Sequence, residues 1–212
     1  MDRIFVGVNR KTTTPLGVVS LSIDPHESDY NTEESIHWYP MRVTYHRETK
    51  IKMLLDNLGI ENFLPMHYEY VETKNEGKKR LLVPAIHNLI FVHSSQETIT
   101  HLKMTREEFS PLRYMMQRSL SDTPTQTIMT VPDRQMDNFI KVASIQDDRV
   151  FFLNYDEAQK IRGRRCKIIE GHFAGVEGTI KRISKNKRVV VQIEGVAAVA
   201  IAFVPASCLT LQ

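Results

Sequence analysis

Histidine and cysteine are the residues of this 212-residue chain that could bind a metal ion or take part in catalysis. There are eight histidines and two cysteines, Cys166 and Cys208. His87 and His93 would share one face of a strand, but no carboxylate or cysteine lies at a metal-ligand spacing beside them. The sequence also contains no HExxH, GxSxG or cysteine–histidine pattern. We therefore expect no catalytic residue, no metal site and no cofactor, and we do not expect an enzyme.

Binding of phosphate by basic side chains is a second kind of chemistry that the sequence could support. The candidates precede and line a predicted helix, and they are Arg42, His46, Arg47, Lys50 and Lys52. Such a face makes salt-sensitive contacts with nucleic acid, although a solvated helix surface is an equally good interpretation. The run of basic residues at 78–80 is more typical of a hairpin tip than of a binding site.

The charge of the chain is unevenly distributed around a net value of +3. Residues 161–212 hold nine Lys/Arg against three Asp/Glu, residues 36–160 hold sixteen of each, and residues 1–35 hold three against six. A basic C-terminal quarter indicates contact with nucleic acid or with an acidic protein face. A solvated basic surface is the commoner meaning of such an excess.

No signal peptide or membrane-spanning stretch is evident in the sequence. We therefore expect a cytoplasmic protein with no membrane partner. In that compartment Cys166 and Cys208 would stay reduced, as small buried thiols. We also expect a monomer.

The basic residues must be positioned by an α+β domain, which we predict over residues 36–146. A strand over 37–43 contains Pro40, which is typical of an edge strand. A helix then follows, with an apolar face formed by Ile51, Leu54, Leu55 and Leu58 and with Gly59 at its end. Two strand-like runs at 60–71 and 81–92 flank a polar turn.

The second half of this domain repeats the pattern. Ser94 and Glu97 form a predicted capping box for a short helix. Strands at 111–117 and 127–131 come next, and a helix follows Pro132. The order strand, helix, strand, strand, helix, strand, strand, helix implies a sandwich with an antiparallel sheet.

The rest of the chain divides into three segments. Residues 162–212 hold strand-length apolar runs separated by short turns, which predicts about five strands in a small closed β-barrel. Residues 147–161 are predicted to be a linker, although the run VFFLNY could add a strand. Residues 1–35 form an N-terminal extension of unknown role, with one possible strand at 18–23.

The run CKIIEGHFAGVEGTI, residues 166–180, resembles a KOW motif, which is typical of NusG-type C-terminal domains and of some ribosomal proteins. Cys166 and Ile168 would point into the barrel, and the glycines would allow a tight turn and close approach of the first two strands. No phosphate-binding loop is indicated, because no G-K-[ST] follows. The residues that carry the resemblance are Lys167, Gly171, Phe173, Gly175 and Gly178.

Residues 36–146 resemble the NusG N-terminal (NGN) domain. Trp38-Tyr39, the stretch 59–66 and the stretch 84–92 follow that family's order and spacing. The resemblance implies an NGN α/β sandwich followed by an SH3-like KOW barrel. His87-Asn88-Leu89 stands where general NusG proteins usually have Gly-Tyr, and it looks most like the specialised UpxY-type antiterminators of capsule polysaccharide operons.

This resemblance implies a transcription elongation or antitermination factor that binds the clamp region of RNA polymerase and suppresses pausing or premature termination. It would also contact non-template DNA or nascent RNA, and it could hold a ribosomal protein through the KOW domain. The polymerase contacts would form an apolar patch, with Tyr68 and Leu89 exposed, although the alternative is that most of its members are core residues. The candidates are Tyr39, Phe63, Met66, Tyr68, Ile86, Leu89 and Phe91.

Two other classes of function compete with this one. A KOW-containing module that binds RNA or ribosomes, without acting on polymerase, would fit the basic C-terminal quarter. It would leave the Trp38-Tyr39, 59–66 and 84–92 elements unexplained. An enzyme with an unfamiliar pocket would need a convergent polar cleft, for which the sequence offers no sign.

Overall fold

The structure is a computed structural model that describes residues 35–73, 77–118, 125–145, 147–153, 163–183 and 186–212. Nearly all of the N-terminal extension, with its possible strand at 18–23, lies outside these residues, as do the turn at 119–124 and residues 154–162.

The N-terminal half is built on a four-stranded antiparallel sheet in the order β2-β5-β1-β6. Its strands are β1 (Ile36–Val43), β2 (Asn62–Phe63), β5 (Leu89–Ser95) and β6 (Leu112–Tyr114). Successive side chains of a strand point to opposite faces. Trp38 and Phe91 therefore belong to one apolar cluster, and Tyr39 and Val92 to another.

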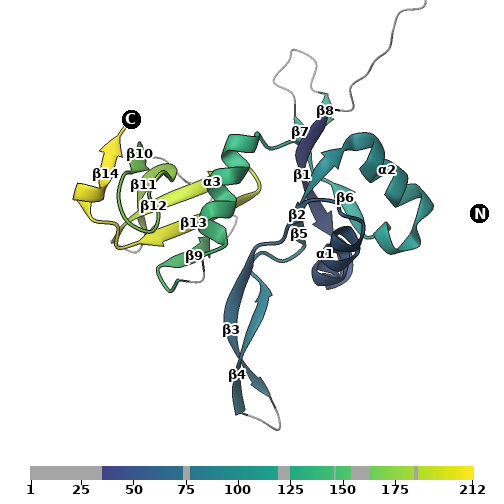
Figure 1. Ribbon diagram of the computed structural model, residues 1–212, viewed down its shortest axis with the longest axis horizontal. Helices are drawn as coiled ribbons and strands as arrows, with labels where there is room; N and C mark the ends of the chain where they lie inside the picture. Colours follow the sequence, from purple (N-terminus) through teal and green to yellow (C-terminus); the bar gives the residue numbers. More distant parts are fainter. Residues whose placement is uncertain (1–34, 74–76, 119–124, 146, 154–162, 184–185) are drawn as a thin grey trace, which may run out of the picture. The chain divides into compact units, whose positions relative to one another are not determined.

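Two helices cover the Tyr39 face of this sheet (Figure 1). The helix α1 (Glu48–Asn57) follows the short 3-10 turn η1 (Thr44–His46) and contributes Ile51 and Leu55 to the core. The helix α2 (Gln96–Thr105), followed by η2 (Glu107–Phe109), contributes Ile99 and Leu102.

The opposite face of the sheet is covered by the helix α3 (Asp133–Ala143). Met136 and Phe139 of α3 are fully buried in the cluster that contains Trp38 and Phe91. The Phe139 ring lies 5.7 Å from the Phe91 ring. The same cluster continues into the C-terminal half of the chain, so α3 has apolar contacts on two sides.

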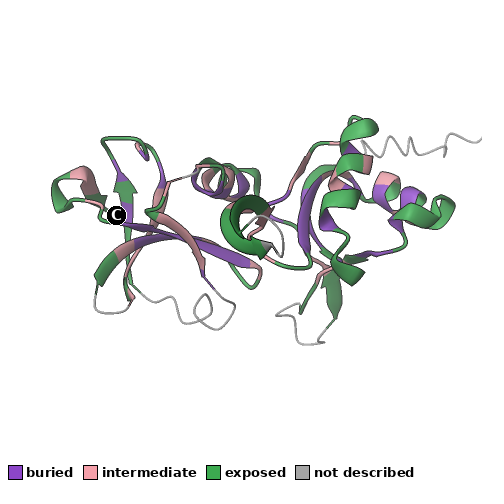
Figure 2. Ribbon diagram, turned by 90° about the horizontal axis from the view of Figure 1, so that it is seen from below, coloured by how far each residue is buried: buried purple, intermediate pink, exposed green. Residues whose placement is uncertain are grey.

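Two small ribbons leave the sheet. The strands β3 (Met66–Thr73) and β4 (Gly77–Pro84) pair only with each other, and most of their residues are exposed (Figure 2). The strands β7 (Met116–Arg118) and β8 (Gln126–Ile128) form a second two-stranded ribbon.

The C-terminal half is a six-stranded antiparallel sheet in the order β14-β10-β11-β12-β13-β9. The run VFFLNY does supply a strand, since β9 (Val150–Leu153) pairs with β13. Cys166 and Ile168 are buried as predicted, and both cysteines are free thiols. The remaining elements are β10 (Arg164–Ile168), β11 (Glu177–Ile183), β12 (Asn186–Ile193), β13 (Ala197–Ala202), η3 (Ala206–Cys208) and β14 (Leu209–Leu211).

Three details of the predicted elements need correction. Pro40 lies in a central strand. Its carbonyl accepts from Met115 N–H at 3.4 Å, just past the end of β6. Proline is tolerated there because the N–H that it lacks would point to the β6 side, where the pairing of β1 with β6 has already ended. The cap of α2 is Ser95, one residue later than predicted, and its hydroxyl accepts from the Thr98 N–H. The runs 60–71 and 81–92 are each broken, so that β3 and β4 leave the sheet as a ribbon.

Gly59 ends α1 with a φ of 68°, as its position predicted. Within the described residues, none of the helices has the length and apolarity that crossing a membrane requires.

Candidate functional site

The seven apolar residues predicted to bind polymerase do not share one surface. Tyr39 is 3% exposed and packs against Tyr114 on the helix α2 side of the sheet, where burial raises the pKa of its phenol. Leu89, Phe91 and Ile86 belong to the other face. Met66 is half-buried against the Tyr39 cluster.

The expectation that Leu89 is exposed is wrong. Its side chain is 4% exposed, because it lies in the cluster that α3 covers. Phe91 is fully buried in the same cluster, and Phe63 packs edge-on against Phe139 with ring centroids 6.3 Å apart. Tyr39, Leu89 and Phe91 are therefore core residues, as the alternative interpretation expected.

Tyr68 is the exposed member of the set. It lies on β3 with 44% of its surface accessible, and the Arg80 guanidinium of β4 sits 4.0 Å from the centre of its ring. Tyr70 and Leu82 on the same ribbon are 69% and 48% exposed. The ribbon therefore presents aromatic, aliphatic and basic groups together, a combination typical of binding surfaces.

A second exposed surface surrounds the turn between β1 and α1. Tyr45 and His46 both have left-handed backbones, with φ of 66° and 50°. This turn leaves Tyr45 79% exposed, with the Arg47 guanidinium 5.7 Å from its ring. Non-glycine residues are strained in this conformation, and strain of this kind is concentrated at functional sites.

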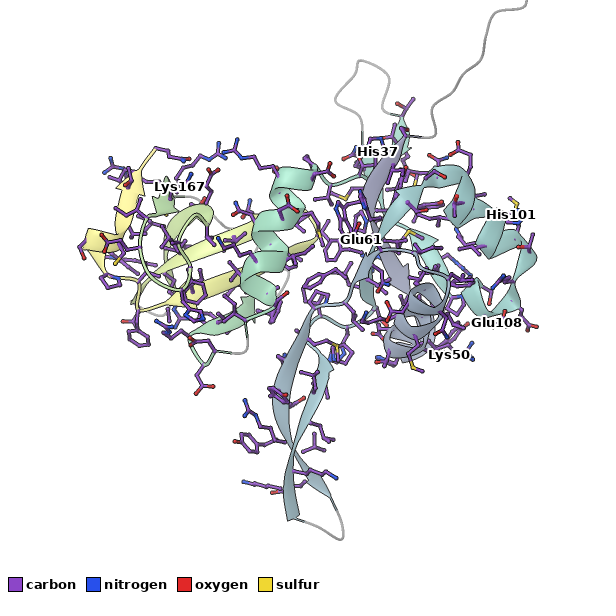
Figure 3. All side chains as sticks on the ribbon, in the orientation of Figure 1. His37, Lys50, Glu61, His101, Glu108 and Lys167 are labelled. Atoms are coloured by element: carbon purple, nitrogen blue, oxygen red, sulfur yellow. The ribbon has the colours of Figure 1, made fainter. Side chains whose placement is uncertain are left out.

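The predicted basic residues are distributed around this turn. Arg42, His46, Arg47 and Lys50 are exposed, and Lys50 projects from α1 (Figure 3). Lys52 is half-buried and forms an ion pair with Asp56 at 3.0 Å. A hydrogen bond from Asn62, followed by one from Lys52, lowers the pKa of Asp56. Lys52 is therefore engaged within the domain, and the other four form the basic surface.

The loop between β4 and β5 is tied to the same turn. Asn88 has a φ of 60°, and its carbonyl accepts from the Val43 N–H at 3.1 Å. Its own N–H donates to Oε1 of Glu48 at 2.5 Å. This pairing brings the His87 ring to 5.9 Å from the His46 ring, in an edge-on arrangement.

Sequence reasoning missed the surroundings of His46 at this turn. Tyr45 and Glu48 were not among the candidates, although His46-x-Glu48 is a spacing that could have drawn attention. His87 was considered only beside His93 on one strand, whereas it lies in the loop before β5. His46 and His87 lie 41 positions apart in the chain and come together only because two loops meet. A spacing search cannot detect such a pair.

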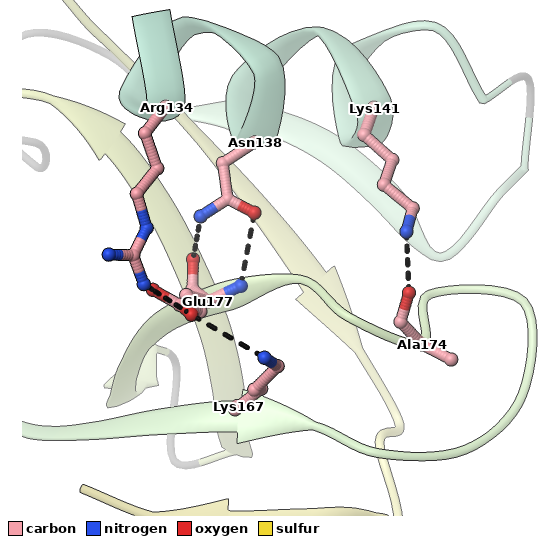
Figure 4. A network of polar contacts seen from close by, with 6 residues as sticks. All are labelled: Arg134, Asn138, Lys141, Lys167, Ala174 and Glu177. Atoms are coloured by element: carbon pink, nitrogen blue, oxygen red, sulfur yellow. Dashed lines mark hydrogen bonds and ion pairs between the residues drawn. The ribbon is translucent and has the colours of Figure 1, made fainter. Parts of the chain in front are cut away.

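The helix α3 is joined to the C-terminal sheet by a polar network (Figure 4). Arg134 donates to both carboxylate oxygens of Glu177 at 2.7 Å, and Lys167 lies 3.7 Å from the same carboxylate. The hydrogen bond from Arg134 is the main cause of the lowered pKa of Glu177. Lys141 donates to the Ala174 carbonyl at 2.5 Å.

The residues of the predicted KOW motif shape the turn that this network uses. Gly171 and Gly175 have positive φ, and the Gly175 N–H donates to the Ile168 carbonyl at 2.7 Å. Phe173 is buried at 4% exposure and Lys167 is exposed. The close approach at Gly178 is to β12, where an added Cβ would lie 2.7 Å from the Val190 carbonyl oxygen.

Two parts of the chain match known families, and both matches agree with this architecture. Residues 36–140 match the family described as Transcription termination factor nusG, and residues 162–194 match the KOW motif. The predicted α+β fold, with an NGN domain followed by a KOW domain, is confirmed. Neither match is to a catalytic family. No curated protein matches the chain.

Proposed function

We propose that this NusG-type chain, in which an NGN domain precedes a KOW domain, is a transcription elongation or antitermination factor that binds RNA polymerase and suppresses pausing or premature termination. The observation that carries the proposal is the exposed turn of Tyr45, His46 and Arg47, which lies within the NusG match. An exposed aromatic ring beside basic side chains can stack on an unpaired base and hold the adjoining phosphates.

The DNA-facing surface in this proposal consists of Tyr45, Arg42, Arg47 and Lys50. All four are exposed, and a strained backbone fixes the direction of the turn that carries the first of them. Single-stranded nucleic acid suits this surface because stacking on Tyr45 requires a splayed base. Exposed non-template DNA and nascent RNA both meet that requirement.

The polymerase contact in this proposal is centred on Tyr68 and Met66. Tyr68 is exposed on the β3–β4 ribbon, and Met66 is half-buried at the base of the same strand. The exposed Tyr70 and Leu82 extend the apolar surface along the ribbon. The buried residues Tyr39, Leu89 and Phe91 would support this contact by fixing the sheet from which the ribbon extends.

The specialised role, in particular operons such as those for capsule polysaccharide, rests on His87-Asn88-Leu89. Asn88 adopts a left-handed backbone, which asparagine tolerates better than most residues. Its carbonyl accepts from Val43 and its N–H donates to Glu48, the residues on either side of the turn between β1 and α1. This tripeptide therefore helps to shape the basic surface around that turn. A factor with a distinct loop here would read a distinct nucleic-acid element.

Transcription in vitro through a terminator tests the proposal. The template carries the leader of the protein's own operon upstream of the terminator, and an unrelated template serves as the comparison. We expect the full chain to raise read-through on its own leader. Tyr45→Ala and Arg47→Ala should each reduce that gain.

Arg106→Ala is the matched control, because it removes one exposed arginine from the end of α2 and leaves the turn intact. It should retain the wild-type gain in read-through. Unchanged read-through with the wild-type chain on both templates would rule out the antitermination role. Equal loss in all three variants would rule out the turn as the nucleic-acid surface.

An RNA- or ribosome-binding module is the second candidate, favoured by the basic C-terminal quarter. Exposed Arg164, Arg165 and Lys167 lie together on β10. Co-purification separates the two candidates. Recovery of the chain with ribosomes and without polymerase would favour this module.

A further inference from the structure

We propose that His46, Glu48 and His87 form a binding site for a divalent transition metal ion, with Zn²⁺ as the expected occupant. One ligand atom of each side chain lies within 4.8 Å of those of the other two. The inference is independent of the proposed role in transcription, because it rests on these three side chains and on the two loops that carry them.

The three ligand atoms are close enough to surround one ion, but within the described ranges they do not form hydrogen bonds or ion pairs with one another. In the described part of the chain no direct hydrogen bond or ion pair joins Glu48 to either histidine. Tetrahedral zinc with bonds of about 2.1 Å requires ligand atoms about 3.4 Å apart. Both imidazoles are exposed, so small rotations of their side chains can close the remaining distance.

Glu48 has the character of an anchored ligand. Its side chain is 3% exposed, although a carboxylate is rarely buried without a cation or several hydrogen bonds. Oε1 accepts from the Asn88 N–H, and among the described residues no lysine or arginine forms an ion pair with Glu48. A hydrogen bond of this kind orients a carboxylate for a metal.

The backbone conformation around the three side chains is a further argument for a binding site. Tyr45, His46 and Asn88 are three of the four non-glycine residues with positive φ in the described chain. They lie on the two loops that carry the ligands, and one of them is itself a ligand. Strained backbone persists where the surrounding structure has a use for it, and here it turns His46 toward His87.

The donor set selects the metal. Two imidazole nitrogens and one carboxylate oxygen match the His₂Glu sets of zinc sites that keep a fourth position for water. Mg²⁺ and Ca²⁺ prefer oxygen ligands alone and would bind poorly. The exposure of both histidines leaves the fourth position open to solvent. A bound ion would cross-link the turn before α1 to the loop at 85–88.

Zinc titration of the full chain tests this site. The protein is treated with a chelator, dialysed and titrated with ZnCl₂ by calorimetry in competition with a weak chelator. We expect one tight equivalent in the wild type and a loss of at least about 100-fold in affinity in both His46→Ala and His87→Ala. Zinc should also raise the unfolding temperature of the wild type, and of neither variant.

His101→Ala is the matched control, because His101 is an exposed histidine on α2 (Figure 3). It should bind zinc as the wild type does. Glu48→Gln could lose its fold because Glu48 is buried, so the two exposed histidines carry the test. Circular dichroism verifies that their alanine variants are folded.

Co²⁺ adds a spectroscopic test of the ligands. Nitrogen and oxygen ligands give visible d–d absorption without the intense thiolate charge-transfer band that binding at Cys166 or Cys208 would give. Absence of a tight equivalent in the wild type would overturn the proposal. So would wild-type affinity in His46→Ala and His87→Ala, or a thiolate band at the first equivalent.

Discussion

The side-chain amide of Asn138 exchanges two hydrogen bonds with the backbone of Glu177. Asn138 Nδ2 donates to the Glu177 carbonyl, and the Glu177 N–H donates to Asn138 Oδ1, both at 3.1 Å (Figure 4). A helix side chain thus pairs with a strand as a neighbouring strand would. The two bonds fix α3, and with it the apolar cluster of the NGN sheet, against the first hairpin of the KOW sheet.

Asn138→Ala should loosen this contact. The substitution removes both partners from half-buried backbone groups of Glu177, which costs about 1–3 kcal/mol. Hydrogen exchange at the Glu177 amide is the direct measurement, and we expect it to be faster than in the wild type. Asp137→Ala, at an exposed neighbouring position of α3, should leave the rate unchanged. Equal rates in all three proteins would contradict the role of the Asn138 side chain.

Phe139→Ala should destabilise the chain more strongly. Phe139 is fully buried between Phe63 and Phe91, and truncation of a buried phenylalanine costs about 3–5 kcal/mol. Denaturant unfolding followed by fluorescence of Trp38 measures the loss, since Trp38 is the single tryptophan and shares the cluster. Met104→Ala, at a side chain 82% exposed on α2, should change the free energy of unfolding little. A loss equal to that of Met104→Ala would contradict the packing.

Acid should weaken the contact between α3 and the KOW sheet. Arg134 lowers the pKa of Glu177 below its ordinary value of 4.5, so the native state favours the ionised carboxylate. That contribution is fully present above pH 4.5 and is lost as the pH falls toward the lowered pKa. The unfolding midpoint, measured from pH 7 to pH 3, should fall across this window.

Glu177→Gln isolates the contribution of this carboxylate. Asp56 and Asp147 also have lowered pKa values, the latter about 2 because of Arg149, so part of the acid dependence belongs to them. The difference between wild type and Glu177→Gln should shrink as the pH falls. Glu170→Gln, at an exposed position before the same turn, is the control. A difference that does not vary with pH would contradict the assignment.

Arg47→Ala should weaken binding of single-stranded DNA in a salt-dependent way. One phosphate contact contributes about 0.7 to the slope of log K against log salt for single strands. Fluorescence anisotropy over a range of salt concentrations should therefore give a shallower slope for this variant. Arg106→Ala removes the same charge from α2 and should keep the wild-type slope. Identical slopes for Arg47→Ala and wild type would place the phosphate contacts elsewhere.

Much of the fold was predictable because it depends on local patterns. The apolar spacing of Ile51 and Leu55 predicted α1, and the glycine at 59 predicted its end, since both depend on residues within a few positions. The KOW turn was predictable for the same reason. The cap of α2 was misplaced by one residue because Ser94 and Ser95 are chemically identical and only the backbone distinguishes them.

The candidate site was less predictable because exposure depends on what covers a residue. Tyr68 and Leu89 are both apolar residues on predicted strands. Leu89 is buried because α3, more than forty residues later, packs over its face of the sheet, whereas β3 extends into solvent. Lys52 resembled the other basic residues until its contact with Asp56 was known.

The sequence by itself therefore determined the elements, the order of the two domains and the family resemblance, because these follow from periodicity and from motifs along the chain. Only the tertiary structure decided which of the apolar residues are surface and which are core. It also decided that His46 and Glu48 lie close to His87. Two loops separated by about forty residues are joined there, because the Val43 N–H donates to the Asn88 carbonyl and the Asn88 N–H donates to the Glu48 carboxylate.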